Sequence, residues 1–170
     1  GSPLRVNPRF SHATPADDRL GFQVRPGLGN GLGVRMEDAD RFAETVEPPI
    51  GDYLRATQAT AMAHLGPVRG DLQLIHGALF PNVGLVPSQF TIRIAHPRGP
   101  QTFEVWSYCL FDKGAPPDVR DEVRKRYLRN FGPGGLFEQD DGENWTQCSA
   151  STTGFMSRQL GFQHQLGLGH

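Results

Sequence analysis

Four carboxylates lie close together in the segment GGLFEQDDGENW, which spans residues 134–145 and also contains Phe137 and Trp145. Adjacent acids repel one another, and carboxylates are rarely buried without a partner of opposite charge. For Asp140 and Asp141 the sequence leaves three interpretations: a solvated helix surface or first helical turn, a carboxylate pair for acid–base work, or a metal ligand. Neighbouring helical residues point about 100° apart, which argues against a shared proton. A metal ligand needs partners such as histidine.

Histidine partners for such a ligand are scarce. His12 in RFSHAT has no second histidine four to six residues before it, which favours a loop residue over a metal ligand. His164 and His170 in HQLGLGH follow the aspartates within a glycine-rich tail, and we assign them to a loop as well. Cys109 and Cys148 form no C-x-x-C pattern, which predicts two free thiols and a cytoplasmic protein.

Length and composition limit the classes of protein to consider. With 170 residues the chain is long enough for one domain with a hydrophobic core. Apolar residues make up 37%, charged residues 21%, and the formal net charge is -1. This balance lacks the basic excess typical of nucleic-acid binding, and no apolar run is long enough to span a membrane. We therefore expect neither nucleic acid nor a membrane as a partner.

Apolar periodicity and turn residues divide most of the chain into predicted elements. The segment 50–66 has helical spacing and ends at a Gly-Pro pair. Three segments rich in β-branched and aromatic residues predict strands, with a hairpin between the last two: 71–82, 89–96 and 102–112. Two further helices are predicted after the strands, at 115–131 and 136–151.

Residues 1–33 contain no periodic pattern and are predicted to form an irregular loop. The glycine-rich run GLGNGLG at 27–33 superficially resembles a nucleotide-binding loop. No clear strand precedes it and no helix follows directly, so a glycine-permitted bend or a short strand is the preferred interpretation.

Strands joined by hairpins and followed by helices predict an α+β fold, in which an antiparallel β-sheet has helices packed over one face. Such an arrangement leaves a cleft between sheet and helices. Phe131 and Phe137 fall at the ends of the two helical segments that border this cleft. For apolar residues of this kind, ordinary core packing is the commoner alternative to lining a ligand pocket.

Three longer motifs in this order narrow the function: HGALFPN (76–82), HPRGPQTFEVWSYCLFDKGAPPDVRDEVRK (96–125) and FGPGGLFEQDDGENW (131–145). Together they closely resemble the catalytic domain of the alpha (large) subunit of Rieske-type aromatic-ring-hydroxylating dioxygenases, particularly the biphenyl and polycyclic-aromatic enzymes. The resemblance is strong from about residue 21 to residue 145 and weaker toward the C-terminus.

For the fold, the resemblance implies an incomplete helix-grip (START-like) catalytic domain. Residues 1–170 would form one partial domain, with an irregular loop at 1–20 and a sheet-plus-helices core at 21–170. The Rieske domain is expected to be absent, because two cysteines, neither beside a histidine, cannot provide the ligands of its 2Fe–2S cluster. That cluster is expected only in a missing N-terminal part.

For the metal, the resemblance implies a mononuclear non-haem Fe(II) held by two histidines and one carboxylate, a ligand set that suits ferrous iron. Asp141 matches the carboxylate ligand. Asp140 matches no ligand position, and Glu138 and Glu143 are expected to face solvent. The family's two iron-binding histidines match no residues of this chain, so we expect the isolated chain neither to bind iron tightly nor to turn over.

Four further positions match residues that line the aromatic substrate cavity of the family: His76, Val86, Phe131 and Phe137. For Val86 and the two phenylalanines, core packing is the alternative that the residues alone leave open. For His76 that alternative is a satisfied histidine inside the core.

The activity implied by the resemblance is oxidation of an aromatic hydrocarbon by dioxygen to a cis-dihydrodiol. Electrons would come from NADH through a reductase and a ferredoxin, and the protein partners would be other alpha subunits and a beta subunit. The alternative function is that of a metal-free module of the same fold that binds flat apolar molecules, for which the predicted cleft and its phenylalanines would suffice.

Overall fold

The computed structural model describes residues 21–36, 39–70 and 72–159. Within them, six strands form one antiparallel sheet in sequence order: β1 (Gly21–Gly27), β2 (Asn30–Met36), β3 (Leu72–Leu79), β4 (Val83–Val86), β5 (Thr91–Pro97) and β6 (Phe103–Cys109). The same residues form α1 (Ala39–Ala43), α2 (Pro48–Gly70), α3 (Pro117–Phe131), α4 (Leu136–Thr152) and the 3-10 turns η1 (Pro87–Gln89) and η2 (Ser157–Gln159). The predicted α+β class with an antiparallel sheet is confirmed.

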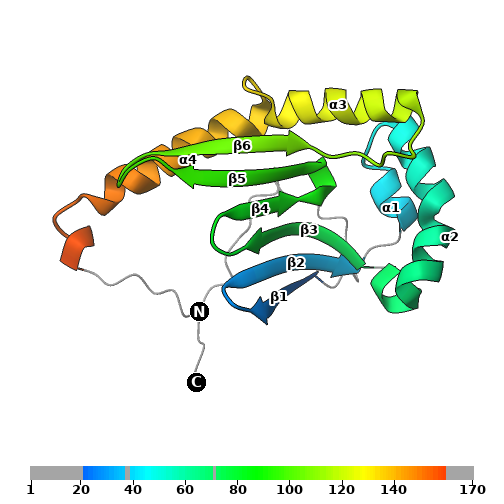
Figure 1. Cartoon of the computed structure of the whole chain (residues 1–170), viewed down its shortest axis with the longest axis horizontal. Coiled ribbons are helices and arrows are strands. Elements are labelled where there is room, and N and C mark those ends of the chain that lie inside the picture. Colours follow the sequence, from blue (N-terminus) through cyan, green and yellow to red (C-terminus); the bar gives the residue numbers. More distant parts are fainter. Residues whose placement is uncertain (1–20, 37–38, 71, 160–170) are drawn as a thin grey trace, which may run out of the picture.

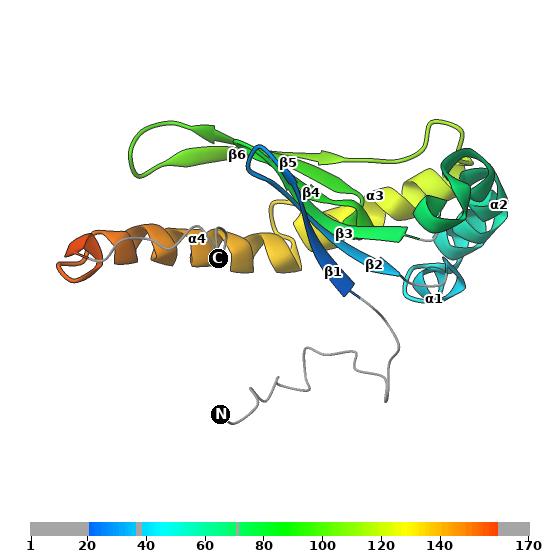
Figure 2. The same ribbon diagram turned by 90° about the horizontal axis from the view of Figure 1, so that it is seen from below.

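The helices are placed unevenly around the sheet. α4 runs behind β5 and β6 in Figure 1 and lies clearly below the sheet in Figure 2, so it covers one face. α1, α2 and α3 gather at the end of the sheet where β5 begins and β6 ends (Figure 1). Helices were predicted to pack over one face of the sheet, and in the structure it is mainly α4 that covers that face.

The loop predicted for residues 21–33 is wrong, because β1 and β2 form a hairpin there. Its turn places Gly27, Leu28 and Gly29 at positive φ values of 101°, 53° and 79°. The two glycines adopt this left-handed backbone without the penalty that a Cβ adds. β2 contains two glycines among its seven residues, and its pairing with β3 satisfies its backbone hydrogen bonds. The short-strand interpretation of GLGNGLG is confirmed, whereas the loop predicted at 1–20 lies outside the described residues.

The other predicted elements are confirmed with small shifts of their boundaries. The strands predicted at 89–96 and 102–112 are β5 and β6, which pair antiparallel across the predicted hairpin. The helix predicted at 50–66 corresponds to α2, whose helical backbone is interrupted at Gly66 (φ 77°, ψ 167°). The long segment predicted as one strand at 71–82 ends in the turn between β3 and β4.

The most buried apolar side chains lie where α2 and α3 meet the sheet. Ile50 of α2 is 1% exposed and Val123 of α3 is 3% exposed, and together with Val46 they form one cluster. Four partly buried side chains pack around this cluster: Phe42, Leu54, Phe90 and Cys109. The cluster anchors α3, from whose end α4 starts along the sheet.

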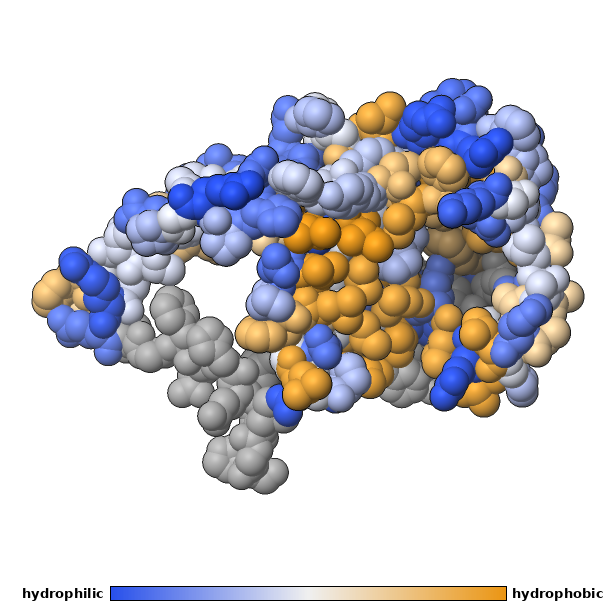
Figure 3. Space-filling model, in the orientation of Figure 1, coloured by the Kyte–Doolittle hydropathy of each residue, from blue (hydrophilic) through white to orange (hydrophobic). Residues whose placement is uncertain are grey.

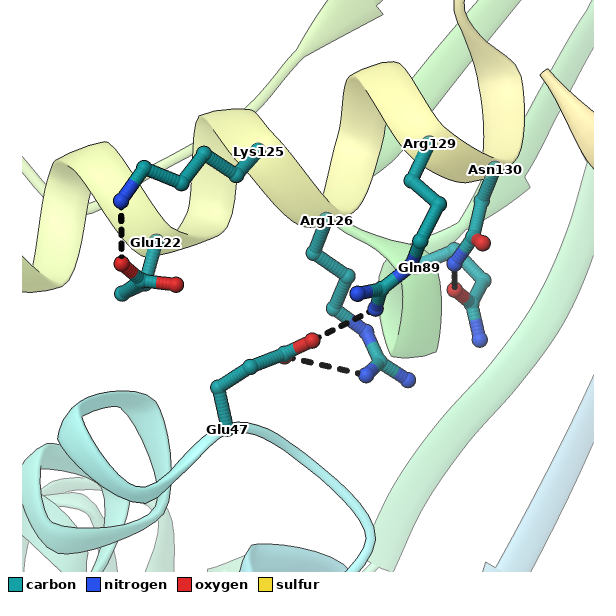
Figure 4. Close-up of polar contacts among 7 residues, drawn as sticks. All are labelled: Glu47, Gln89, Glu122, Lys125, Arg126, Arg129 and Asn130. Carbon is teal, nitrogen blue, oxygen red and sulfur yellow. Dashed lines mark hydrogen bonds and ion pairs between the residues drawn. The ribbon is translucent and has the colours of Figure 1, made fainter.

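A half-buried ion-pair network joins the segment between α1 and α2 to α3, as Figure 4 shows. Glu47 Oε2 accepts a hydrogen bond from Arg126 at 3.1 Å, and Glu47 Oε1 accepts one from Arg129 at 2.5 Å. Partial burial raises the pKa of Glu47, but hydrogen bonds from Arg129, from its own backbone and from Arg126 outweigh it, and the pKa lies below its ordinary value. Farther along α3, Asn130 donates to Gln89 of η1 at 2.7 Å.

Replacing Glu47 by Gln should lower the free energy of unfolding by about 1–2 kcal/mol at neutral pH, because two arginines lose their charged acceptor. Since folding lowers the pKa of Glu47, its contribution is complete above the unfolded-state value and is lost as the pH falls through the lower folded-state pKa. The difference between the two proteins should therefore shrink below about pH 4.3. Urea unfolding at a series of pH values measures it.

Glu122→Gln is the matched control for this prediction. Glu122 pairs with Lys125, whose side chain is 69% exposed, so solvent screens the interaction (Figure 4). This substitution should change stability much less. An equal loss in the two variants, or a loss for Glu47→Gln that does not depend on pH, would contradict the role given to Glu47.

Apolar side chains gather over the middle strands on the face turned away from α4, as Figure 3 shows in the view of Figure 1. Successive strand residues point to opposite faces, so Trp106 and Tyr108 of β6 also lie on this face, and they are 47% and 43% exposed. An exposed apolar patch of this kind is typical of a surface that contacts another protein part. No helix in the described residues has the length and apolarity needed to cross a bilayer.

Candidate active site

A cavity of about 420 Å³ opens between the sheet and α4, where the sequence predicts a cleft. Its lining includes side chains of four strands and of α4, among them His76, Val86, Arg93, Phe103, Val105 and Trp145. Apart from His76, Asn82 and Arg93, the lining residues are apolar or glycine. The volume and the apolar lining with a few polar groups are typical of a site for a small organic molecule.

Two of the four predicted substrate positions, His76 and Val86, line this cavity. His76 of β3 is exposed, and the side-chain nitrogen of Gln23 lies 3.4 Å from its Nε2. His76 is therefore not the buried core histidine that the sequence left open. Val86, the last residue of β4, is half-buried.

The other two predicted positions, Phe131 and Phe137, pack against each other at the junction of α3 and α4, with ring centroids 5.7 Å apart. Phe131 is 7% exposed, and Phe137 is 41% exposed. Neither belongs to the residues that line the cavity. Phe131 instead lies against Arg93, one of the lining residues, with 5.0 Å between its ring centroid and the guanidinium carbon. Contact of the two phenylalanines with substrate stays a prediction.

Two acids of α4, Glu138 and Asp141, meet Arg93 of β5. Arg93 Nη2 donates to Glu138 Oε2 at 2.5 Å, and Arg93 Nη1 donates to Asp141 Oδ2 at 2.9 Å. The expected solvent-facing position of Glu138 is wrong, because its side chain is only 23% exposed and is bound to a cation supplied by the sheet. Glu143 is exposed, as expected, and Asp140 is exposed as well. The acid that shares a partner with Asp141 is thus Glu138, one helical turn away, and not its neighbour.

Asp141 has the chemistry of a ligand for ferrous iron, and its side chain is 40% exposed. Its Oδ2 is bonded to Arg93, and no residue in the described part of the chain donates a hydrogen bond to Oδ1. Within residues 21–36, 39–70 and 72–159, no group of three or more His, Cys, Asp or Glu side chains could hold a metal ion. The described residues therefore fit one ligand position of an iron site and not a complete ligand set. His12, His164 and His170 lie outside these residues.

Comparison with known proteins places the chain in a family. A model of the family described as ring hydroxylating alpha subunit (catalytic domain) matches residues 12–167. The chain belongs to this family. It is 36% identical over 159 residues to the alpha subunit of benzene 1,2-dioxygenase from Pseudomonas putida, a match that covers 91% of this chain and 35% of that protein. It is 34% identical over 164 residues to the alpha subunit of biphenyl 2,3-dioxygenase from Rhodococcus jostii (strain RHA1). That match covers 94% of this chain and 35% of the relative.

Solved structures of ring-hydroxylating alpha subunits share the fold. A naphthalene 1,2-dioxygenase mutant bound to phenanthrene matches with a TM-score of 0.73 at 25% identity, over 86% of this chain and 34% of that one. Naphthalene 1,2-dioxygenase with indole in its active site matches with a TM-score of 0.70 at 26% identity, over 81% of this chain and 32% of that one. The chain spans about a third of the length of the relatives it matches. The family resemblance and the fold inferred from the motifs are both confirmed.

Three residues of this alpha-subunit site had no predicted role: Arg93, Phe103 and Trp145. The ring of Trp145 lies 5.6 Å from that of Phe103 and 4.8 Å from the Arg93 guanidinium carbon, so the three form one wall of the cavity. A signal for Arg93 was present in the sequence, because an arginine in the middle of an apolar strand requires an acidic partner. Two acids three residues apart on a predicted helix were candidates for it.

Gly33 of β2 leaves the space that the His76 ring occupies. A Cβ at Gly33 would overlap the imidazole, so the ring must move. With naphthalene as a flat apolar probe of this cavity, we expect Gly33→Ala to weaken whatever binding the unsubstituted chain shows by about tenfold, equivalent to about 1.4 kcal/mol, as measured by fluorescence titration. Gly31→Ala is the matched control in the same strand, because a Cβ there meets no atom within 4 Å. If the two variants bind naphthalene equally, His76 does not border the ligand.

Proposed function

We propose that this chain forms part of the catalytic domain of an aromatic-ring cis-dihydroxylating dioxygenase, an oxidoreductase that adds both atoms of dioxygen to an arene. The observation that carries the proposal is the apolar cavity of about 420 Å³ between sheet and α4, with Arg93 in its wall and Asp141 bonded to that arginine. The family of the chain supports the reaction type, because relatives bear the names of benzene, biphenyl and naphthalene dioxygenases.

The substrate of this proposal is a flat aromatic hydrocarbon held in the cavity. Val86 and the facing rings of Phe103 and Trp145 bind it by apolar contact and exclude water. His76 gives the cavity a polar edge. Phe131 and Phe137 are proposed to close its end at the junction of α3 and α4.

Asp141 is the residue of this chain that we propose as a ligand of mononuclear non-haem Fe(II). When bound, that iron supplies the activation of dioxygen. The two histidine ligands are proposed to come from outside the described residues, so no reaction step is assigned to the metal here. We further propose that the complete enzyme contains a 2Fe–2S Rieske cluster and receives electrons from NADH through a reductase and a ferredoxin. The proposed subunit partners are other alpha subunits and a beta subunit, and the proposed location is the cytoplasm.

A chimera tests the proposed function. Residues 21–159 replace the corresponding segment of the Pseudomonas putida benzene 1,2-dioxygenase alpha subunit, which is expressed with its partner proteins. We expect the chimera to bind iron and to form a cis-dihydrodiol from benzene, biphenyl or naphthalene, detected by chromatography. A folded chimera that contains its Rieske cluster but neither binds mononuclear iron nor forms product would contradict the proposal.

The second candidate function is that of a metal-free module for flat apolar molecules. The apolar cavity favours it. Titration of the chain with naphthalene and, separately, with Fe(II) under anaerobic conditions distinguishes the candidates. Tight stoichiometric binding of Fe(II) would rule out the metal-free module, whereas naphthalene binding without iron, combined with an inactive chimera, would favour it.

A further inference from the structure

Arg93 is the point at which the sheet and α4 are joined by charge. It extends from the middle of β5, its side chain is only 10% exposed, and it binds Glu138 and Asp141 through different terminal nitrogens. Glu138 and Asp141 are one turn apart and Trp145 follows one turn later, and all three contact Arg93, so they lie on the face of α4 toward the sheet. A single guanidinium of β5 thus binds two successive turns of α4.

Two aromatic rings confine this guanidinium. The Phe131 ring centroid lies 5.0 Å from the guanidinium carbon, and the Trp145 ring centroid lies 4.8 Å from it. The guanidinium is planar with donors in a fixed fork, so rings on its faces and acids at its edge leave it one orientation. Its Nε has no partner within the described part of the chain, which leaves the two acids as its hydrogen-bond acceptors there.

The consequence for Asp141 is that its two oxygens are not equivalent. Oδ2 is committed to Arg93 at 2.9 Å, whereas Oδ1 receives no hydrogen bond from residues 21–36, 39–70 or 72–159. Carboxylates that bind metals are in general oriented by hydrogen bonds from neighbouring groups, and loss of such a group typically weakens metal binding 10–100-fold. Glu138, which is more buried, accepts a hydrogen bond from Arg93 Nη2. It therefore does not compete with Asp141 for Arg93 Nη1.

We propose that Arg93 is the positioning residue of Asp141: its hydrogen bond to Oδ2 fixes the orientation in which Asp141 presents its carboxylate to a metal ion. This inference rests on the proposed function in one respect, the assignment of Asp141 as an iron ligand. The proposal gives Arg93 a role although Arg93 is not itself proposed as a metal ligand.

The test uses the chimera described above, with equilibrium affinity for Fe(II) as the readout and product formation recorded separately. Arg93→Met keeps an unbranched apolar stem like that of arginine but removes the guanidinium and both hydrogen bonds, and we expect it to weaken Fe(II) binding about 10–100-fold. Arg93→Lys keeps the charge but cannot reach both acids in the fixed geometry of the fork, so its affinity should be intermediate. Arg98→Met is the matched control, because Arg98 is 56% exposed and pairs with Glu104 in the β5–β6 hairpin.

Glu138→Gln separates positioning from general stabilisation. This substitution weakens the contact between Arg93 and position 138 of α4 but leaves the hydrogen bond between Arg93 and Asp141. It should therefore lower the thermal midpoint of unfolding while changing Fe(II) affinity by less than about threefold. Equal losses of affinity in Glu138→Gln and Arg93→Met would overturn the proposal, as would an Arg93→Met chimera that binds Fe(II) like Arg98→Met. If Arg93→Met does not fold, Arg93→Lys decides, and an unchanged affinity in that variant overturns the proposal. Failure of the unsubstituted chimera to bind iron contradicts the proposed function itself.

Discussion

Asp141→Asn is expected to abolish cis-dihydrodiol formation by the chimera that carries residues 21–159, with a loss of more than about 100-fold. The estimate follows from the 10–100-fold effects of groups that merely support metal ligands, which loss of the ligand itself should exceed. Asparagine keeps the shape of the side chain, and Arg93 keeps its bond to Glu138. The measurements are product yield by chromatography and iron content of the purified protein.

The control for this substitution is Asp140→Asn, at the exposed neighbouring position. It should leave product yield within about twofold of the unsubstituted chimera, because an exposed carboxylate without a partner in the site contributes little. Asp141 is 40% exposed, so its loss should cost at most about 1 kcal/mol of stability. A chimera with Asp141→Asn that retains iron and activity would show that the carboxylate ligand lies elsewhere.

Phe131→Ala is expected to lower the free energy of unfolding of the chain by about 3–5 kcal/mol. Phe131 is 7% exposed and contacts both the Phe137 ring and the Arg93 guanidinium, so its removal opens a cavity where α3, α4 and β5 meet. Urea unfolding followed by circular dichroism measures the change. Leu128→Ala, on the same helix but 52% exposed, should cost less than about 1 kcal/mol.

The same variant distinguishes the two roles that the sequence leaves open for Phe131. If it lines the substrate cavity, naphthalene affinity of the folded fraction should fall together with stability. If it belongs only to the core, stability should fall while the affinity of the folded protein stays close to that of the unsubstituted chain. If Phe131→Ala lowered the free energy of unfolding no more than Leu128→Ala, both roles of Phe131, cavity lining and core packing, would be contradicted.

The local patterns of the chain were sufficient for most of the elements and for the family. The 3.6-residue repeat of Val119, Val123, Tyr127 and Phe131 predicts α3; in the structure Tyr127 is half-buried and the other three are buried. The alternation in β5 and the turn residues after it predict the β5–β6 hairpin. These features depend on residues a few positions apart, which is why a single sequence reveals them. The β1–β2 hairpin escaped prediction because its glycine-rich strands carry little pattern of their own and depend on pairing with β3.

The residues that surround Glu138 and Asp141 could not be predicted from such local patterns. The sequence distinguishes Asp141 by its motif, but the partner of Asp141 is 48 residues away and the partner of Glu138 is the same arginine, 45 residues away. Alternation in β5 shows that Arg93 and Ile92 point to opposite faces, but not which face α4 covers. That depends on how α3 is anchored by the cluster around Ile50 and Val123 and where α4 therefore starts. Of the crowded acids, Asp140 and Glu143 are exposed to solvent, whereas Glu138 and Asp141 bind one buried cation that the tertiary fold brings to them. Charge neutralisation across the sheet–helix contact is therefore a property of the assembled chain.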